Sequence, residues 1–162
     1  MNNFKNKTIL ITGASSGIGE CFAKTLDELG ANLILTARSK DKLDQMVLSM
    51  NSAISIPGDL SDISFSKKLY NQIKEKELTV DILINNAGFG FSGLFLDSNM
   101  KNYKEMMDVN MYSLVALTHL FLNDMVKRKN GGIINISSLA SFQAIPYFSM
   151  YAASKAFVTS FT

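Results

Sequence analysis

The chain has 162 residues, of which 47% are hydrophobic and 19% are charged, and its formal net charge is +2. This length fits one domain, and the composition supports a buried core and excludes a chain that is disordered throughout. The small net charge does not indicate binding to nucleic acid or to a membrane surface. No segment has the roughly 18 consecutive apolar residues of a membrane span. We therefore expect a single globular domain that binds neither.

One cysteine, Cys21, occurs in the sequence. A lone cysteine cannot form an internal disulfide, which is typical of a reducing compartment, and the polar first residues do not resemble a signal peptide. We expect a cytoplasmic protein in which Cys21 packs into the core from a helix.

Short apolar strands alternate with helices along the chain. The sequence predicts strands at residues 7–12, 32–37, 53–57, 80–85 and 133–137, and helices at residues 18–29, 39–50, 61–76, 102–129 and 149–162. The strands are continuous apolar runs, which are typical of a parallel sheet covered on both faces. Because crossover connections are right-handed, the leading fold is an α/β doubly wound parallel sheet.

Unusual residues follow every predicted strand. They are the glycine-rich loop 12–19, then Arg38, Asp59, the segment 86–88 and Ser138. The carboxyl ends of the strands of an open parallel sheet meet at one edge, where ligands bind. The sequence therefore predicts one ligand site built from five loops.

The first of these loops reads T-G-A-S-S-G-I-G over residues 12–19. Glycines between a strand and a helix let the chain turn tightly and let a phosphate approach the N–H groups at the helix start. The spacing differs from the general G-x-G-x-x-G fingerprint, and the G-K-[ST] ending of a nucleoside-triphosphate loop is missing. A plain tight connection is the alternative.

A tyrosine and a lysine, Tyr151 and Lys155, stand four residues apart near the end of the sequence. On a helix this spacing places both on one face, and a neighbouring ammonium favours the ionised phenol. Taken alone, the pair is more often part of an ordinary surface helix. The upstream loops make proton transfer the better interpretation.

Together these motifs resemble the short-chain dehydrogenase/reductase family. They are T-G-A-S-S-G-I-G, N-N-A-G at residues 85–88, V-N at 109–110, and I-N-I-S-S followed by Y-A-A-S-K at 134–155. The resemblance covers essentially the whole chain, in order and at the family's spacing. It implies a Rossmann-type sheet of five strands in the order 3-2-1-4-5 with helices on both faces, and a single NADP-binding domain over residues 1–162. It also implies an NAD(P)-dependent oxidoreductase that interconverts a carbonyl and an alcohol by hydride transfer.

The resemblance further implies a role for each catalytic candidate. Tyr151 would be the general acid/base, and Lys155 would favour its ionisation and hold the nicotinamide ribose. Ser138, thirteen residues before the tyrosine, would hydrogen-bond the substrate oxygen, whereas Ser137 would be structural. Asn110 would kink the long helix and hold a water in a proton relay, although an asparagine bonding its own backbone is the alternative.

Cofactor preference is read at the end of the second strand. An acidic residue there binds the ribose 2′-hydroxyl of NAD, whereas an arginine accommodates the 2′-phosphate of NADP. Ala37 stands in the place of the acid and Arg38 follows it, so NADP(H) is favoured over NAD(H); a solvated loop arginine is the alternative. Asp59 and Leu60 would frame the adenine, although a Pro-Gly-Asp turn explains Asp59 almost as well. The expected cofactor-binding residues are Thr12, Gly13, Ser15, Ser16, Gly17, Ile18, Gly19, Arg38, Asp59, Leu60, Asn86, Ala87, Gly88, Tyr151 and Lys155.

The sequence departs from the family pattern after Lys155. Family members continue with two further strands, a P-G motif and a lid over the substrate, and these are not in the sequence. We expect the 162 residues to be the larger N-terminal part of an oxidoreductase that acts on a small-molecule carbonyl or alcohol and is a homo-oligomer at full length. A cofactor-binding or structural module without turnover is the alternative.

The single histidine, His119, is expected to pack or to contact another subunit, which leaves no basis for a metal cluster.

Overall fold

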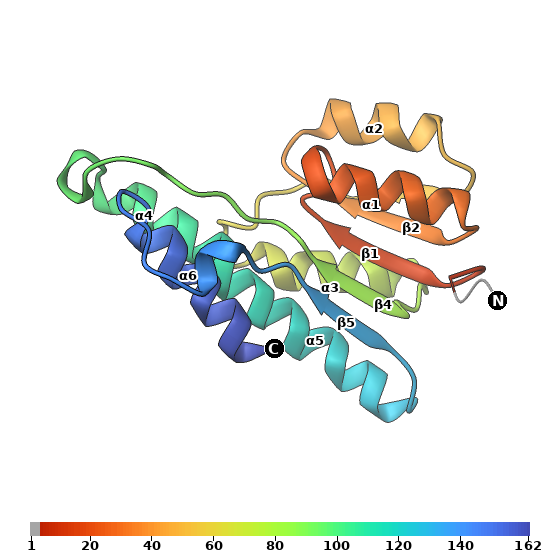
Figure 1. The fold of residues 1–162 in the computed structure, drawn as a ribbon. Helices are drawn as coiled ribbons and strands as arrows, with labels where there is room; N and C mark the ends of the chain where they lie inside the picture. Colours follow the sequence, from red (N-terminus) through yellow and green to blue (C-terminus); the bar gives the residue numbers. More distant parts are fainter. Residues whose placement is uncertain (1–3) are drawn as a thin grey trace.

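The computed structural model of the protein describes residues 4–162. Its centre is one sheet of five parallel strands in the order β3-β2-β1-β4-β5 (Figure 1). The strands are β1 (Thr8–Thr12), β2 (Asn32–Thr36), β3 (Ala53–Ser55), β4 (Ile82–Asn85) and β5 (Gly132–Asn135). The predicted strand order is confirmed.

Helices cover both faces of the sheet. They are α1 (Gly17–Glu28), α2 (Lys40–Leu48), α3 (Phe65–Glu75), α4 (Met100–Met107), α5 (Ser113–Lys127) and α6 (Ser149–Phe161). Figure 1 shows α1 and α2 on one side of the sheet and α3, α5 and α6 on the other. This arrangement is the doubly wound α/β architecture that the sequence predicts.

Alternate residues of the strands pack into two separate hydrophobic cores, one on each face of the sheet. Ile9 and Ile11 pack with the residues of α1 and α2, whereas Leu10 between them packs with those of α3 and α5. All three side chains are fully buried. Because both faces of the sheet are apolar, the strands read as continuous hydrophobic runs.

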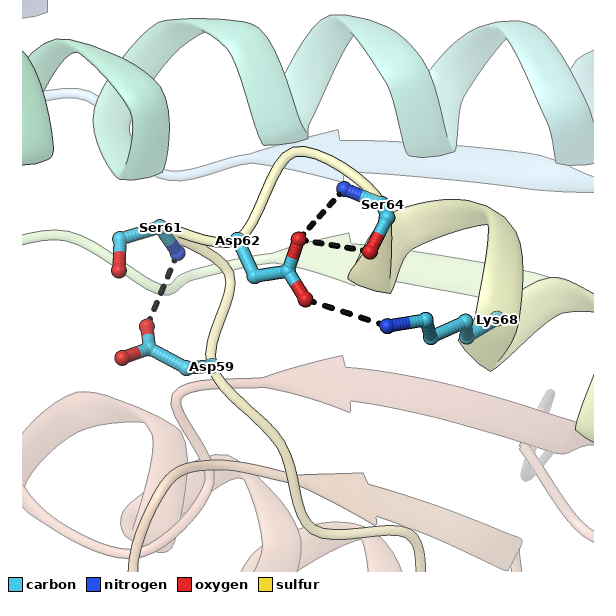
Figure 2. A network of polar contacts seen from close by, with 5 residues as sticks. All are labelled: Asp59, Ser61, Asp62, Ser64 and Lys68. Carbon is cyan, nitrogen blue, oxygen red and sulfur yellow. Dashed lines mark hydrogen bonds and ion pairs between the residues drawn. The ribbon is translucent and has the colours of Figure 1, made fainter.

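The third helix begins later than the sequence predicts. In place of a helix from residue 61, two aspartates each hold a turn before α3 starts at Phe65. The Asp59 Oδ1 accepts a hydrogen bond of 2.9 Å from the Ser61 amide, and the Asp62 Oδ1 accepts one of 2.9 Å from the Ser64 amide (Figure 2). Aspartate competes in this way with helical hydrogen bonding, which moves the helix start downstream.

The predicted long helix over residues 102–129 is two helices joined by a π-helical turn, Asp108–Tyr112. The turn lies between α4 and α5 and contains Asn110. Regular α-helical hydrogen bonding is therefore interrupted at Asn110, where the resemblance implies a kink. A π-turn widens the helix by one residue and is often found at functional sites.

One side chain lies differently from the expectation: Cys21 is an exposed free cysteine on the outer face of α1 and does not pack in the core. His119 is exposed on α5, so of its two expected roles only contact with another subunit stays a prediction. Helical periodicity alone did not distinguish the outer positions of these helices. Within residues 4–162, no helix combines the length and the apolar character that a membrane crossing requires.

Candidate active site

The carboxyl edge of the sheet carries a cavity of about 450 Å³. This volume lies within the range of small-molecule and cofactor sites. The predicted residues that line it are Gly13, Ser15, Ser16, Gly17, Ile18, Arg38, Asp59, Leu60, Asn86, Ala87, Gly88, Tyr151 and Lys155. The structure thus brings together around one cavity the residues that follow β1, β2, β3 and β4 and the first part of α6.

The glycine-rich loop turns at two glycines with positive φ, Gly13 at 65° and Gly17 at 56°. Such angles favour glycine, because other residues are strained there. Ser16 is the N-cap of α1, yet its side chain makes no capping hydrogen bond. The loop therefore presents a hydroxyl and the positive end of a helix to the cavity, as an anion site requires.

Thr12 and Gly19 do not line the cavity but hold its loops in place. The Thr12 hydroxyl accepts hydrogen bonds from the amides of Asn86 and Ala87, at 3.0 and 2.9 Å. The Asn86 Nδ2 donates in return to the backbone oxygens of Thr12 and Gly13, at 2.9 and 3.2 Å. A Cβ at Gly19 would lie 2.3 Å from the Gly13 oxygen, so this close packing requires a glycine.

Beyond β2, Arg38 lies exposed in the loop before α2, and Lys42 is in the first turn of α2; both line the cavity. The sequence reasoning missed Lys42, although its place at the start of the helix after the second strand, close in sequence to Arg38, was the available signal. With Lys155, these residues give the described lining three cationic groups against the single carboxylate of Asp59. The wall therefore favours an anionic ligand.

Asp59 and Leu60 both line the cavity after β3. Leu60 is buried at 6% exposure and belongs to the core beneath α3. One oxygen of Asp59 is used in the turn with Ser61, so the turn interpretation of Asp59 accounts for part of its environment (Figure 2).

Tyr151 and Lys155 lie on the same face of α6, and both line the cavity. The Lys155 Nζ is 5.9 Å from the centre of the Tyr151 ring and donates a 2.9 Å hydrogen bond to the Ile136 oxygen. Lys155 is only 5% exposed, and this burial lowers the pKa of its ammonium below the ordinary value. Tyr151 is half-buried, with its ring edge-to-face against Phe148 at 6.1 Å.

Asn110 braces this end of the site from the π-turn. Its Oδ1 accepts from the Phe89 amide at 3.0 Å, and its Nδ2 donates to the Phe89 oxygen at 2.9 Å and to the Ser154 Oγ at 3.0 Å. The Ser154 hydroxyl in turn donates to the backbone carbonyl oxygen of Tyr151 at 2.8 Å. Asn110 is 1% exposed and bonds other segments, which sequence reasoning did not anticipate, and Ser154 was missed altogether.

The two serines after β5 have different surroundings. The Ser137 hydroxyl donates to the Lys155 oxygen at 2.9 Å and lies 2.6 Å from the Thr159 Oγ1, so it fastens β5 to α6. The Ser138 hydroxyl accepts from the Ala140 amide at 3.2 Å, as the cap of a short helical turn. Ser137 borders the cavity, whereas Ser138 does not belong to its lining.

Comparison with known proteins identifies this arrangement. A model of the short chain dehydrogenase family matches residues 7–162. A fatty acyl-CoA reductase from Acinetobacter baylyi is 38% identical over 99% of this chain, and the match covers 56% of the relative. The chain thus spans a little over half the length of that curated relative.

Solved structures agree in fold. A short-chain dehydrogenase from Sphingobium yanoikuyae in complex with NADPH matches with a TM-score of 0.90 at 31% identity, over 96% of this chain and 62% of its own. One from Burkholderia phymatum in complex with NAD matches with a TM-score of 0.91 at 28% identity, over 99% of this chain and 59% of its own. The family thus includes complexes with either dinucleotide. The chain belongs to the short-chain dehydrogenase family and has its Rossmann-like, nucleotide-binding fold.

Proposed function

We propose that this chain is the cofactor-binding and proton-transfer part of an NADP-dependent oxidoreductase that interconverts a carbonyl and an alcohol. The observation that carries the proposal is one cavity that is lined by an anion-binding glycine loop, by Arg38 and by the Tyr151–Lys155 pair. Residues 1–162 would act as a single domain, since all five strands belong to one sheet.

The cavity residues fit a dinucleotide phosphate. The start of α1, with the free hydroxyl of Ser16, would hold the pyrophosphate, and Arg38 and Lys42 would hold the 2′-phosphate. Asp59, Leu60 and the segment 86–88 would border the adenosine. When bound, the cofactor supplies the hydride equivalent of the reaction. An NADPH complex of a relative supports this fit, and Ala37 in place of an acid supports NADP over NAD.

The proton chemistry would belong to Tyr151. Its phenol would donate a proton to the substrate oxygen during reduction and accept one during oxidation. The nearby Lys155 ammonium, in a poorly solvated position, would stabilise the phenolate. Ser138 would hydrogen-bond the substrate oxygen, a role that stays a prediction because its hydroxyl is used here as a turn cap.

Asn110 would act mainly as a positioning residue. Both hydrogens of its amide are donated within the protein, to Phe89 and Ser154, which supports a brace for the loop and for α6. The water relay through Asn110 stays a prediction.

A cytoplasmic location, the absence of a nucleic-acid partner, and a homo-oligomeric full-length enzyme also stay predictions. Exposed apolar side chains on the π-turn and α5, Tyr112, Leu122 and Val126, support the last of these.

Turnover of a phenylalanine variant tests the proposal. Tyr151→Phe removes the phenolic proton and little volume, so NADPH-dependent carbonyl reduction is expected to fall at least about 100-fold, as for loss of a general acid. NADPH affinity, measured by the fluorescence of the reduced nicotinamide, should stay within about twofold, since the aromatic ring remains. Unchanged reduction by the variant would remove Tyr151 from its role, and a chain that binds no NADPH would contradict the cofactor assignment.

A further inference from the structure

Gly90 lies in the loop after β4, directly against the ring of Tyr151. A Cβ built at Gly90 would be 2.6 Å from the Tyr151 Cδ2, 2.8 Å from its Cγ and 3.2 Å from its Cβ. Distances below 3.0 Å essentially do not occur for real Cβ atoms. The crowded atoms belong to the base of a rigid ring, so a small side-chain adjustment would not relieve the contact.

The backbone gives no other reason for a glycine at this position. The glycines with positive φ are Gly13, Gly17, Gly30, Gly93 and Gly131 within the described residues, and Gly90 is not among them. Gly90 is also exposed, so an alanine methyl group would not be buried in a core. The ring of Tyr151 is thus the feature that excludes a side chain here.

The parts on either side of this contact are both held in place. Before Gly90, the backbone N–H and C=O of Phe89 are both hydrogen-bonded to the side-chain amide of Asn110. After Gly90, the backbone N–H of Gly93 donates to the backbone oxygen of Tyr147 at 3.1 Å. On the helix side, the Lys155 Nζ is bonded to the Ile136 oxygen. Since neither the loop nor α6 can easily retreat, a methyl group at residue 90 would turn the Tyr151 ring.

We propose that Gly90 is a positioning residue for the proton donor: by leaving room for the ring, it sets where the Tyr151 phenol stands relative to Lys155 and the cavity. This inference rests on the proposed role of Tyr151, and it adds a residue that acts only through that side chain. Gly88 lies against Lys155 as Gly90 lies against Tyr151, because a Cβ at Gly88 would be 3.1 Å from the Lys155 Nζ.

A double-mutant cycle tests the contact without relying on turnover. Gly90→Ala is expected to lower the free energy of unfolding in the parent chain, but to leave it unchanged in a Tyr151→Ala background, where the ring is gone. Gly132→Ala is the matched control, because a Cβ at Gly132 meets no heavy atom within 4 Å and its φ is not positive. An equal effect of Gly90→Ala in both backgrounds would overturn the inference, as would an effect no larger than that of the control.

Kinetics and ring spectroscopy then separate positioning from simple packing. With ¹³C-labelled tyrosine, Gly90→Ala should shift the Tyr151 ring signal and lower kcat at least tenfold, while the NADPH Kd stays within twofold; Gly132→Ala should do neither. If the double-mutant cycle showed coupling between Gly90 and Tyr151 but Gly90→Ala left kcat unchanged, the positioning role would be contradicted. If Tyr151→Phe retained full turnover, the proposed function would fail instead, whatever the cycle showed.

Discussion

At the scale of single residues, Lys155 is the clearest case of a side chain whose position costs stability. Its ammonium is buried, and none of the ion pairs among residues 4–162 includes it. Burial without a carboxylate lowers the pKa of the ammonium, because the charged form is poorly solvated. Such an uncompensated charge is typical of a functional position.

The lowered pKa of Lys155 predicts a pH dependence of stability. Between the lowered pKa of the folded state and the ordinary lysine pKa of 10.5, the unfolded chain binds more protons at this residue, so stability rises with pH in that window. From about pH 8 to about pH 10, the parent chain should therefore gain free energy of unfolding relative to Lys155→Met. Denaturant titrations at the two pH values measure the difference.

Lys24→Met provides the control for this titration. The pKa of Lys24 is raised by its hydrogen bond and ion pair with Glu20, so its contribution is nearly constant below 10.5. Parallel stability curves for the parent and Lys155→Met would show that the ammonium is not desolvated in solution.

At the scale of elements, the site depends on how two loops pack on each other. The start of α1 meets the loop after β4, where the Asn86 side chain bonds two backbone oxygens of the glycine-rich loop. A Cβ at Gly19 would lie 2.3 Å from the Gly13 oxygen and 2.5 Å from the Asn86 Nδ2. The helix can thus point its positive end into the cavity only with glycine at this position.

Gly19→Ala tests this packing because the expected sign is unusual. An alanine within a helix normally stabilises by about 0.5–1 kcal/mol over glycine. Here we expect the free energy of unfolding to fall by about 1–3 kcal/mol, as for overpacking, and NADPH binding to weaken with it. Chemical denaturation beside Gly132→Ala gives the comparison, and a Gly19→Ala variant as stable as that control would refute the packing argument.

The elements also show what the sequence could and could not predict. Apolar runs located the five strands, because a sheet buried on both faces leaves short continuous apolar segments whose length and flanking turn residues distinguish them from helices. The predicted start of α3 was wrong by four residues, since the carboxylate of Asp62 accepts a hydrogen bond that holds a turn before the helix. The π-turn follows from tertiary bonds of Asn110 to Phe89 and Ser154, which periodicity does not encode.

At the scale of the whole molecule, strand order determines the site. Placing β1 at the centre, between β2 and β4, brings the glycine-rich loop beside Arg38 on one flank and the segment 86–88 on the other. The motifs were therefore sufficient to predict most of the cavity wall. Lys42 and Gly90 were not predicted, because their importance depends on contacts made only after folding.

The central claim, that this sheet edge binds NADP through Arg38, is tested most directly by titrating NADPH and NADH into the parent chain and Arg38→Ala. A charge-assisted contact to a phosphate contributes about 1.5–3 kcal/mol, so the variant should bind NADPH at least about tenfold more weakly. NADH lacks the 2′-phosphate, and its affinity should change by less than about twofold. Equal losses for both cofactors, or none for NADPH, would contradict the account.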